Sequence, residues 1–131
     1  MALLDPPART IADATDASGL FAALAEETLE VLAVAYLNRD QRLLGLRHTR
    51  SEHRDRLALP IRTIAADALA FDAGAVVIAH NHPSGDATPS RADRDATRLL
   101  LRALDPIDVR LLDHLIVTRR GVTSFHALGL L

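Results

Sequence analysis

The sequence contains no cysteine among its 131 residues. It therefore has no disulfide bond, no thiolate nucleophile and no thiolate metal ligand, so a bound metal ion must be held by histidine and carboxylate. The same absence excludes the zinc deaminases of nucleobases, whose ligand set includes cysteine. Lysine is absent too, since all 15 basic residues are arginine, and this excludes a lysine general base or Schiff base.

Long hydrophobic runs are also missing. The N-terminal stretch Met1–Pro7 has neither a basic region nor a long apolar segment, so we expect a soluble, cytoplasmic protein without a membrane partner. The net charge of −2 does not favour autonomous nucleic-acid binding, which usually leaves a basic footprint. With 49% hydrophobic residues, the chain can bury the core of one ordinary domain.

Hydrophobic periodicity and turn residues predict the order helix, hairpin, helix, strand, helix, hairpin. We expect residues 1–17 to form an irregular lead-in and residues 47–56 to form a polar loop or ragged edge. The predicted helices span about 18–27, 61–73 and 90–105. The predicted strands span about 30–37, 42–46, 75–79, 109–117 and 122–125.

The third predicted helix has two contrasting faces. Its apolar face is expected to be formed by Ala92, Ala96, Leu99, Leu100 and Ala103. The opposite face carries an arginine stripe, defined as Arg91, Arg94, Arg98 and Arg102, at spacings of three and four residues. Such a stripe is either a solvated face or a surface for nucleic acid or another acidic partner.

Two histidines follow the apolar run Ala75–Ala79 directly. In an extended chain, residues i and i+2 point to the same side, so His80 and His82 can share one metal ion at the end of a strand. Pro83 is expected to end that strand, because proline has a fixed φ and no N–H to donate. The alternative is a pair of histidines at a polar strand end.

Ser90 and Asp93 form a capping-box-like start to the third helix. Asp93 follows His82 by eleven residues and supplies the carboxylate that a third zinc ligand requires. A carboxylate in the first helical turn also stabilises the helix dipole, so capping alone is the alternative reading of Asp93.

Zinc hydrolases keep three protein ligands and leave the fourth position to a water whose pKa falls to about 7. Such a site also needs a carboxylate that does not coordinate the metal and acts as general acid and base. Glu30 is the candidate, because a charged residue at the end of the apolar strand 30–37 is otherwise out of place. The alternative is a solvated residue at the strand entrance.

The run HNHPSGDATPSRAD, from His80 to Asp93, resembles the JAMM (MPN+) metalloprotease superfamily, whose pattern is Glu, His-x-His-Pro, Ser and Asp. Within that superfamily it resembles the bacterial RadC-like branch, with a JAB/MPN domain over 18–131. Four further segments are similar to that branch: Leu29–Val31, Leu112–Val117, Ser124–Phe125 and Gly129–Leu131. The resemblance covers residues 26–131 and implies an α/β fold, a mixed β-sheet with flanking helices that is similar to the cytidine deaminase fold.

The resemblance also implies roles for five residues. His80, His82 and Asp93 would bind Zn²⁺, Glu30 would be the general acid/base, and the Ser90 hydroxyl would help to stabilise the oxyanion. A zinc metallopeptidase of this kind uses zinc-activated water to cleave an amide or isopeptide bond in a peptide or protein, such as a conjugated tag. The RadC branch is named for a connection to DNA repair.

Two features depart from the RadC-like pattern. RadC-like proteins usually carry an additional N-terminal helical, DNA-binding-like region, for which we expect no room in this chain, and the segment Arg47–Pro60 lacks the Phe-x-Gly-Thr and Pro-Arg-Glu signatures. We therefore expect elements that face the substrate to differ. The rival function is a non-catalytic interaction module associated with DNA repair, which would use the arginine stripe.

Asp113 shares strand parity with Leu111 and Leu115 and is expected to point inward. A buried carboxylate needs a partner, which is either a ligand histidine or a group of the backbone or sheet. The remaining histidines are expected to be structural or solvated; they are His48, His53, His114 and His126.

Overall fold

The computed structural model describes residues 9–50 and 59–131. Parts of the expected lead-in (1–8) and of the expected polar loop (51–56) therefore lie outside the described residues. The helices are α1 (Ala14–Phe21), α2 (Ile61–Ala70), α3 (Arg91–Leu104) and two short 3₁₀ helices, Ala22–Glu26 and Asp105–Ile107. The strands are β1 (Val31–Leu37), β2 (Leu43–Arg50), β3 (Ala75–Asn81), β4 (Arg110–Thr118) and β5 (Gly121–Ser124).

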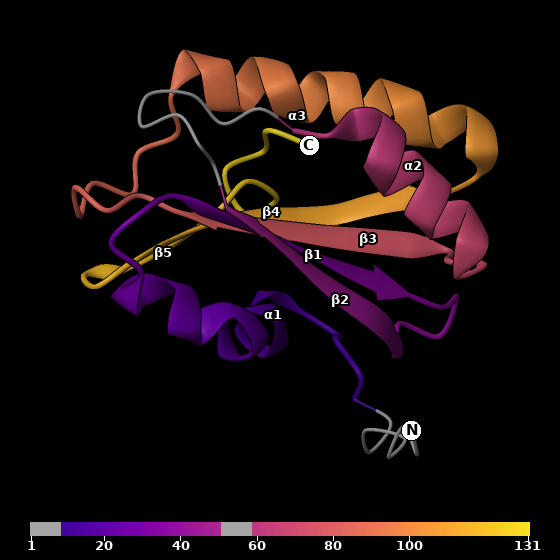
Figure 1. The fold of residues 1–131 in the computed structure, drawn as a ribbon, viewed down its shortest axis with the longest axis horizontal. Coiled ribbons are helices and arrows are strands. Elements are labelled where there is room, and N and C mark those ends of the chain that lie inside the picture. The colour runs from indigo at the N-terminus through magenta and orange to yellow at the C-terminus, as the bar shows by residue number, and fades with distance from the viewer. Residues whose placement is uncertain (1–8, 51–58) are drawn as a thin grey trace.

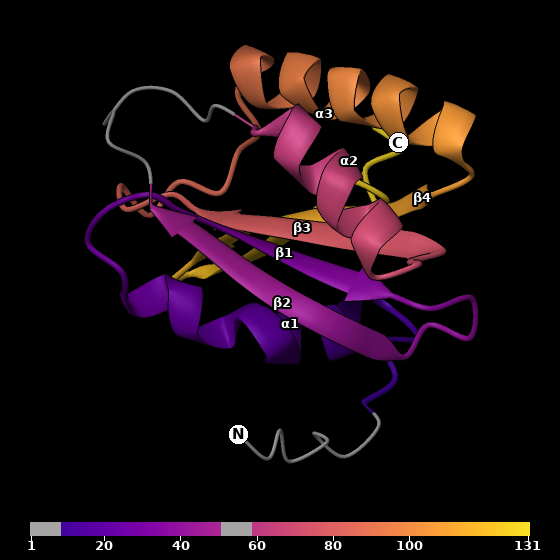
Figure 2. The ribbon, with the colours of Figure 1, turned by 45° about the vertical axis from the view of Figure 1, so that its right-hand side comes forward.

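The five strands form one mixed sheet in the order β2-β1-β3-β4-β5. β3 and β4 are parallel and joined through α3, whereas the other neighbouring pairs are antiparallel. Helices α2 and α3 cover one face of the sheet and α1 covers the other (Figures 1 and 2). The predicted α/β fold with a mixed sheet and flanking helices is confirmed.

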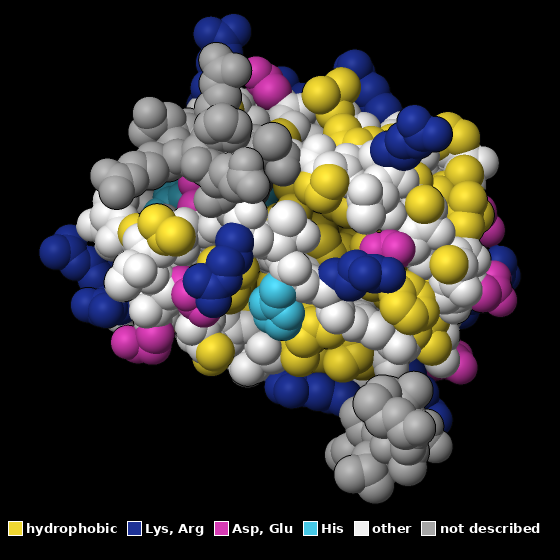
Figure 3. Space-filling model, viewed as in Figure 1, with side chains coloured by type: hydrophobic (Ala, Val, Ile, Leu, Met, Phe, Trp, Pro, Cys, Tyr) yellow, Lys and Arg dark blue, Asp and Glu magenta, His cyan; other side chains and the backbone are white. Residues whose placement is uncertain are grey.

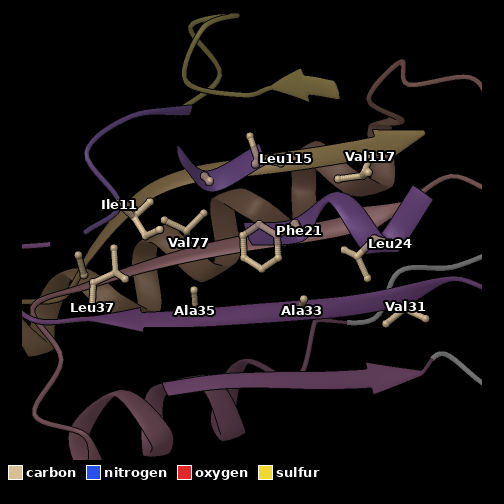
Figure 4. Close-up of a cluster of buried hydrophobic side chains, with 13 residues drawn as sticks. Ile11, Phe21, Leu24, Val31, Ala33, Ala35, Leu37, Val77, Leu115 and Val117 are labelled. Carbon is tan, nitrogen blue, oxygen red and sulfur yellow. The ribbon is translucent and has the colours of Figure 1, made fainter. Parts of the chain in front are cut away.

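Alternate residues of the central strands face the two helical layers, as the two-residue repeat of a strand requires. The odd-numbered residues of β1 and β3 pack toward α1 and the following 3₁₀ helix, where Phe21 and Leu24 meet them (Figure 4). The even-numbered residues Leu32, Val34 and Tyr36 pack with residues of α2 and α3. Polar residues that continue this even-numbered series therefore lie on the α3 side of the sheet.

The start of α1 and the end of β2 differ from the sequence-based prediction. Helix α1 begins at Ala14, four residues before Ser18, because the Asp13 side chain caps the helix by accepting a hydrogen bond from the Asp16 backbone N–H. Strand β2 continues to Arg50, which pairs with Val31, so the beginning of the expected polar loop is strand. The polar composition of this stretch suits an edge strand, whose side chains are largely solvated.

The predicted buried face of α3 is confirmed at Leu100 but wrong at Ala92 and Leu99, which are exposed. Its buried residues are Asp93, Thr97, Leu100 and Leu104, whereas Leu99 is 54% exposed. Two of these four buried positions are polar. A prediction from hydrophobicity alone therefore placed the buried face one residue too early along the helix. The arginine stripe is exposed, as predicted.

Candidate metal centre

The end of β3 brings His80 and His82 to the same side of the sheet, as their spacing predicts. Their Nε2 atoms are 3.0 Å apart, and the strand ends at Asn81, two residues before Pro83. The Nδ1 atom of His82 is 2.7 Å from the backbone oxygen of Asp86. Because a carbonyl oxygen only accepts, Nδ1 must carry a hydrogen, so in the neutral ring the Nε2 lone pair of His82 faces the site.

Asp93 reaches the histidines from the first turn of α3. Its Oδ1 atom lies 3.4 Å from Nε2 of His80, and its Oδ2 atom lies 3.2 Å from Nε2 of His82. Oδ2 also accepts the backbone N–H of Ser90 at 2.9 Å. The same carboxylate therefore caps the helix and faces both histidines, so the two readings of Asp93 are compatible.

Glu30 approaches the same point from the neighbouring strand. Leu32 is paired with His80 in the antiparallel β1–β3 register, and continuing that register by two residues sets Glu30 opposite His82. The Oε1 atom of Glu30 is 3.8 Å from Nε2 of His80, and its side chain is only 13% exposed. Glu30, His80 and His82 offer ligand atoms that all lie within 4.8 Å of one another.

Asn81 fixes the backbone on both sides of Glu30. Its side chain accepts the Val31 N–H at 2.6 Å and donates to the carbonyl oxygens of Glu27 and Leu29 at 3.2 and 2.9 Å. The residue is 1% exposed. Sequence reasoning missed this role, although an asparagine between two site histidines was a signal for it.

The surroundings of the two carboxyl groups shift their pKa values in opposite directions. Burial raises the pKa of Glu30, although the two histidines oppose this effect. Burial also raises the pKa of Asp93, but hydrogen bonds with His80 and His82 outweigh burial and hold it well below its usual range. The hydrogen bond with Asp93 raises the pKa of His82 despite partial burial. Asp93 is thus the permanent anion, whereas Glu30 is suited to exchange a proton.

Ser90 caps α3, and its hydroxyl oxygen accepts the Asp93 N–H at 3.0 Å. Both halves of the predicted capping box are present. The cap uses a lone pair of the hydroxyl and leaves its hydrogen free, while an oxyanion needs that hydrogen. Capping and oxyanion stabilisation therefore do not compete, and the catalytic role of Ser90 stays a prediction.

Asp113 is buried but does not contact His80 or His82. Its Oδ1 atom accepts the backbone N–H groups of His114 and His126 at 2.8 and 3.0 Å, and Oδ2 accepts the Ser124 hydroxyl at 2.6 Å. The alternative of backbone and sheet partners is therefore the observed one. The carboxylate joins β4 to the end of β5.

His114, expected to be structural or solvated, lies directly behind the site. Its ring stacks on Phe125, with 4.3 Å between centroids, and its Nε2 atom is 2.7 Å from Nδ1 of His80. Burial lowers the pKa of His114 well below its usual value. The presence of a histidine inside the apolar strand 109–117 could have indicated a buried role. Its contact with His80, however, depends on a strand register that the sequence does not reveal.

A cavity of about 380 Å³ adjoins His82. The loop residues 83–85 line one side, and Arg119 and Arg120 from the β4–β5 turn line another. Of the two histidines, His82 lines this cavity.

The side chains at this point fit a zinc ion. Two imidazole nitrogens and carboxylate oxygens are the ligand types that zinc takes in hydrolases without cysteine. Asp93 lies closer to both histidines than Glu30 does to His80, which favours Asp93 as the third ligand. The same ligand types also suit other divalent ions that prefer nitrogen and oxygen.

Comparisons with known proteins agree with this fold. The sequence model described as "RadC-like JAB domain" matches residues 11–130. The UPF0758 protein Mpe_A2695 of Methylibium petroleiphilum is 44% identical over 108 residues, which are 82% of this chain and 49% of that protein. The UPF0758 protein YfjY of Escherichia coli is 41% identical over 102 residues, which are 78% of this chain and 64% of that protein.

The chain spans about half the length of several of these relatives. The name UPF0758 states no activity. In the part of the chain that the structure describes, no helix is both long and apolar enough to cross a membrane.

The match over residues 11–130 includes α1, so the similarity begins before residue 26, where the resemblance seen in the sequence starts. The chain belongs to the RadC-like JAB domain family.

Proposed function

We propose that the chain is a zinc-dependent hydrolase of the JAMM type that cleaves an amide or isopeptide bond. One observation carries this proposal: Nε2 of both His80 and His82 meets the Asp93 carboxylate, while a second carboxylate stands 3.8 Å from His80. Amide hydrolysis needs both parts, a metal centre and a separate proton carrier.

His80, His82 and Asp93 would hold the ion. Bound there, zinc supplies Lewis-acid chemistry, which makes water more acidic and polarises the carbonyl group to be attacked. The hydrogen bonds of His82 to Asp86 and of Asp93 to Ser90 hold two of these side chains in place before the ion arrives.

Glu30 would transfer the proton. Its carboxylate accepts a proton from the attacking water as the carbon–oxygen bond forms, and it gives that proton to the amine nitrogen as the carbon–nitrogen bond breaks. Its pKa, raised by burial, brings it closer to neutral pH, where a proton carrier is most effective. The Ser90 hydroxyl would donate its free hydrogen to the carbonyl oxygen as negative charge develops there.

The substrate would be a peptide or protein, with the scissile group entering through the cavity beside His82. An extended segment of a protein, such as the end of a conjugated tag, has the shape to reach a strand end of this kind. The rival function, a DNA-repair interaction module, depends on the exposed arginine stripe of α3. On the face shown in Figure 3, basic side chains are scattered among acidic and apolar ones, and the net charge of −2 disfavours that rival.

Zinc-loaded protein incubated with a diverse peptide library and with an isopeptide-linked peptide, followed by mass spectrometry, tests the proposal. Cleavage at a defined bond that stops when a chelator removes zinc, and returns when zinc is added back, is the expected result. No cleavage of either substrate, together with salt-dependent DNA binding that is lost when Arg94 and Arg98 are both replaced by glutamate, would favour the rival.

A further inference from the structure

A chain of buried hydrogen bonds runs behind the metal centre. Nδ1 of His80 is 2.7 Å from Nε2 of His114, and Nδ1 of His114 is 2.7 Å from Oγ1 of Thr97. The Thr97 hydroxyl then donates to the backbone oxygen of Asp93 at 2.7 Å. His80, Thr97 and His114 are each 0% exposed, so water does not compete for these contacts.

The hydrogen bond from Thr97 to the Asp93 carbonyl determines the direction of the others. The carbonyl oxygen of Asp93 can only accept, so the Thr97 hydroxyl gives it its single hydrogen. Thr97 must then accept from His114, which places a hydrogen on Nδ1 of that ring and, in the neutral ring, leaves Nε2 as an acceptor. His80 consequently donates from Nδ1.

We propose that Thr97 and His114 are positioning residues that fix His80 in the tautomer with hydrogen on Nδ1 and thereby aim its Nε2 lone pair at the metal. A metal-binding histidine commonly donates its other N–H to a carboxylate, a backbone carbonyl or water. Here a second histidine receives that hydrogen, and a threonine returns the chain to the backbone of Asp93.

The chain of hydrogen bonds is closed through Asp93. The carbonyl of this residue anchors Thr97, and its carboxylate lies 3.4 Å from Nε2 of His80. Thr97 stands one helical turn after Asp93 on the same buried face of α3. Two of the three proposed ligands are therefore oriented by one network, which links the helix to the end of β3.

Stacking of His114 on Phe125 holds the ring plane. The ring needs only one hydrogen for its two contacts, one given to Thr97 and one received from His80. A neutral histidine meets this requirement and a charged one does not, since a charged ring has no acceptor.

This inference rests on the proposed metal centre, but the tautomer is a property of the protein's own hydrogen bonds. Nitrogen-15 NMR of the metal-free wild-type protein at pH 8 reads it directly. The expected spectrum shows hydrogen on Nδ1 of His80 and on Nδ1 of His114. An Nδ1 atom of His80 without hydrogen would overturn the inference.

Substitution of Thr97 tests the effect on the metal. Thr97→Val removes the hydroxyl that links His114 to the Asp93 carbonyl. We expect its zinc affinity, measured by chelator competition, to fall about 10- to 100-fold. Thr97→Ser keeps the hydroxyl and should bind zinc nearly as well as the wild type. Thr118→Val is the matched control, because Thr118 is also buried and donates to a carbonyl, that of Gly121, but takes no part in the hydrogen bonds behind His80.

The results separate the inference from the proposed function. Wild-type protein that binds no zinc, but shows the expected tautomers, would remove the proposed function and leave the network standing. Zinc affinity and His80 tautomer both unchanged in Thr97→Val would overturn the inference and leave the metal centre standing. If Thr97→Val does not fold, the wild-type NMR spectrum and the Thr97→Ser affinity still decide.

Discussion

The carboxylate of Glu30 lies 3.8 Å from Nε2 of His80, although the two residues are far apart in the sequence. The antiparallel pairing of β1 with β3 produces this contact, because Leu32 is opposite His80 and the chain before Leu32 runs along the end of β3. The proposed proton carrier therefore directly precedes β1, beside the end of β3 that carries the proposed metal ligand.

Replacing Glu30 by glutamine should separate catalysis from metal binding. Glu30→Gln keeps the shape of the side chain but cannot accept a proton, so kcat is expected to fall by about 10²- to 10⁴-fold while zinc content stays at the wild-type level. Glu26→Gln, which alters an exposed carboxylate near the cavity, is the control and should leave kcat unchanged. A Glu30→Gln enzyme with full activity would remove Glu30 from the mechanism.

Asn81→Ala should destabilise the protein because it leaves the buried Val31 N–H without its acceptor. Each buried polar group left unpaired costs about 1–3 kcal/mol, and urea unfolding measures the loss. Asn38→Ala removes an asparagine that accepts two N–H groups in an exposed turn, and it should cost less. Equal losses for the two variants would show that Asn81 does not hold the segment around Glu30.

Zinc affinity should rise with pH. The pKa of His82 is raised above its ordinary value of 6.5 by the hydrogen bond with Asp93, so a proton must leave before zinc can bind Nε2. For the same reason, the stabilisation that this proton gives the metal-free fold is complete below pH 6.5 and is lost as pH rises through the raised pKa. Calorimetry in buffers of different ionisation enthalpy measures proton release, and zinc affinity that falls with rising pH would contradict this picture.

Tyr36, the single tyrosine of the chain, offers a test away from the metal. Burial, together with Asp67, which accepts a hydrogen bond from the phenol at 3.2 Å, raises the pKa of Tyr36 above its ordinary value of 10.0. The raised pKa stabilises the fold below pH 10, and this contribution is lost as pH rises through it. Absorbance at high pH should show a protonated phenol until unfolding, and Asp67→Asn should lower its pKa; a phenol titrating normally in folded protein would refute the assigned contacts.

Local spacing predicted much of the fold and the site. The two-residue repeat placed His80 and His82 on one side of β3, and the three-residue spacing of Ser90 and Asp93 predicted a capping box that the structure confirms. Both predictions needed only the geometry of a single element. Element order was also predictable, because apolar runs alternate with turn residues.

The network behind the site was not predictable in the same way. His114 meets His80 only because β4 runs parallel to β3 in one register, and Thr97 meets His114 only because α3 crosses above that pair. Burial of polar residues on α3 also hid its inward face, since Asp93 and Thr97 resemble surface residues in a hydrophobicity pattern. These positions depend on contacts between elements that are far apart in the sequence. The residue pattern within a single element therefore does not predict them.

Crystals of the zinc-loaded protein, measured on both sides of the zinc absorption edge, test the metal centre most directly. We predict one anomalous peak bounded by Nε2 of His80, Nε2 of His82 and the carboxylate of Asp93, with zinc–nitrogen distances of about 2.0–2.1 Å and Glu30 outside the coordination sphere. The absence of a peak at this position, or a peak coordinated by Glu30 in place of Asp93, would contradict the account.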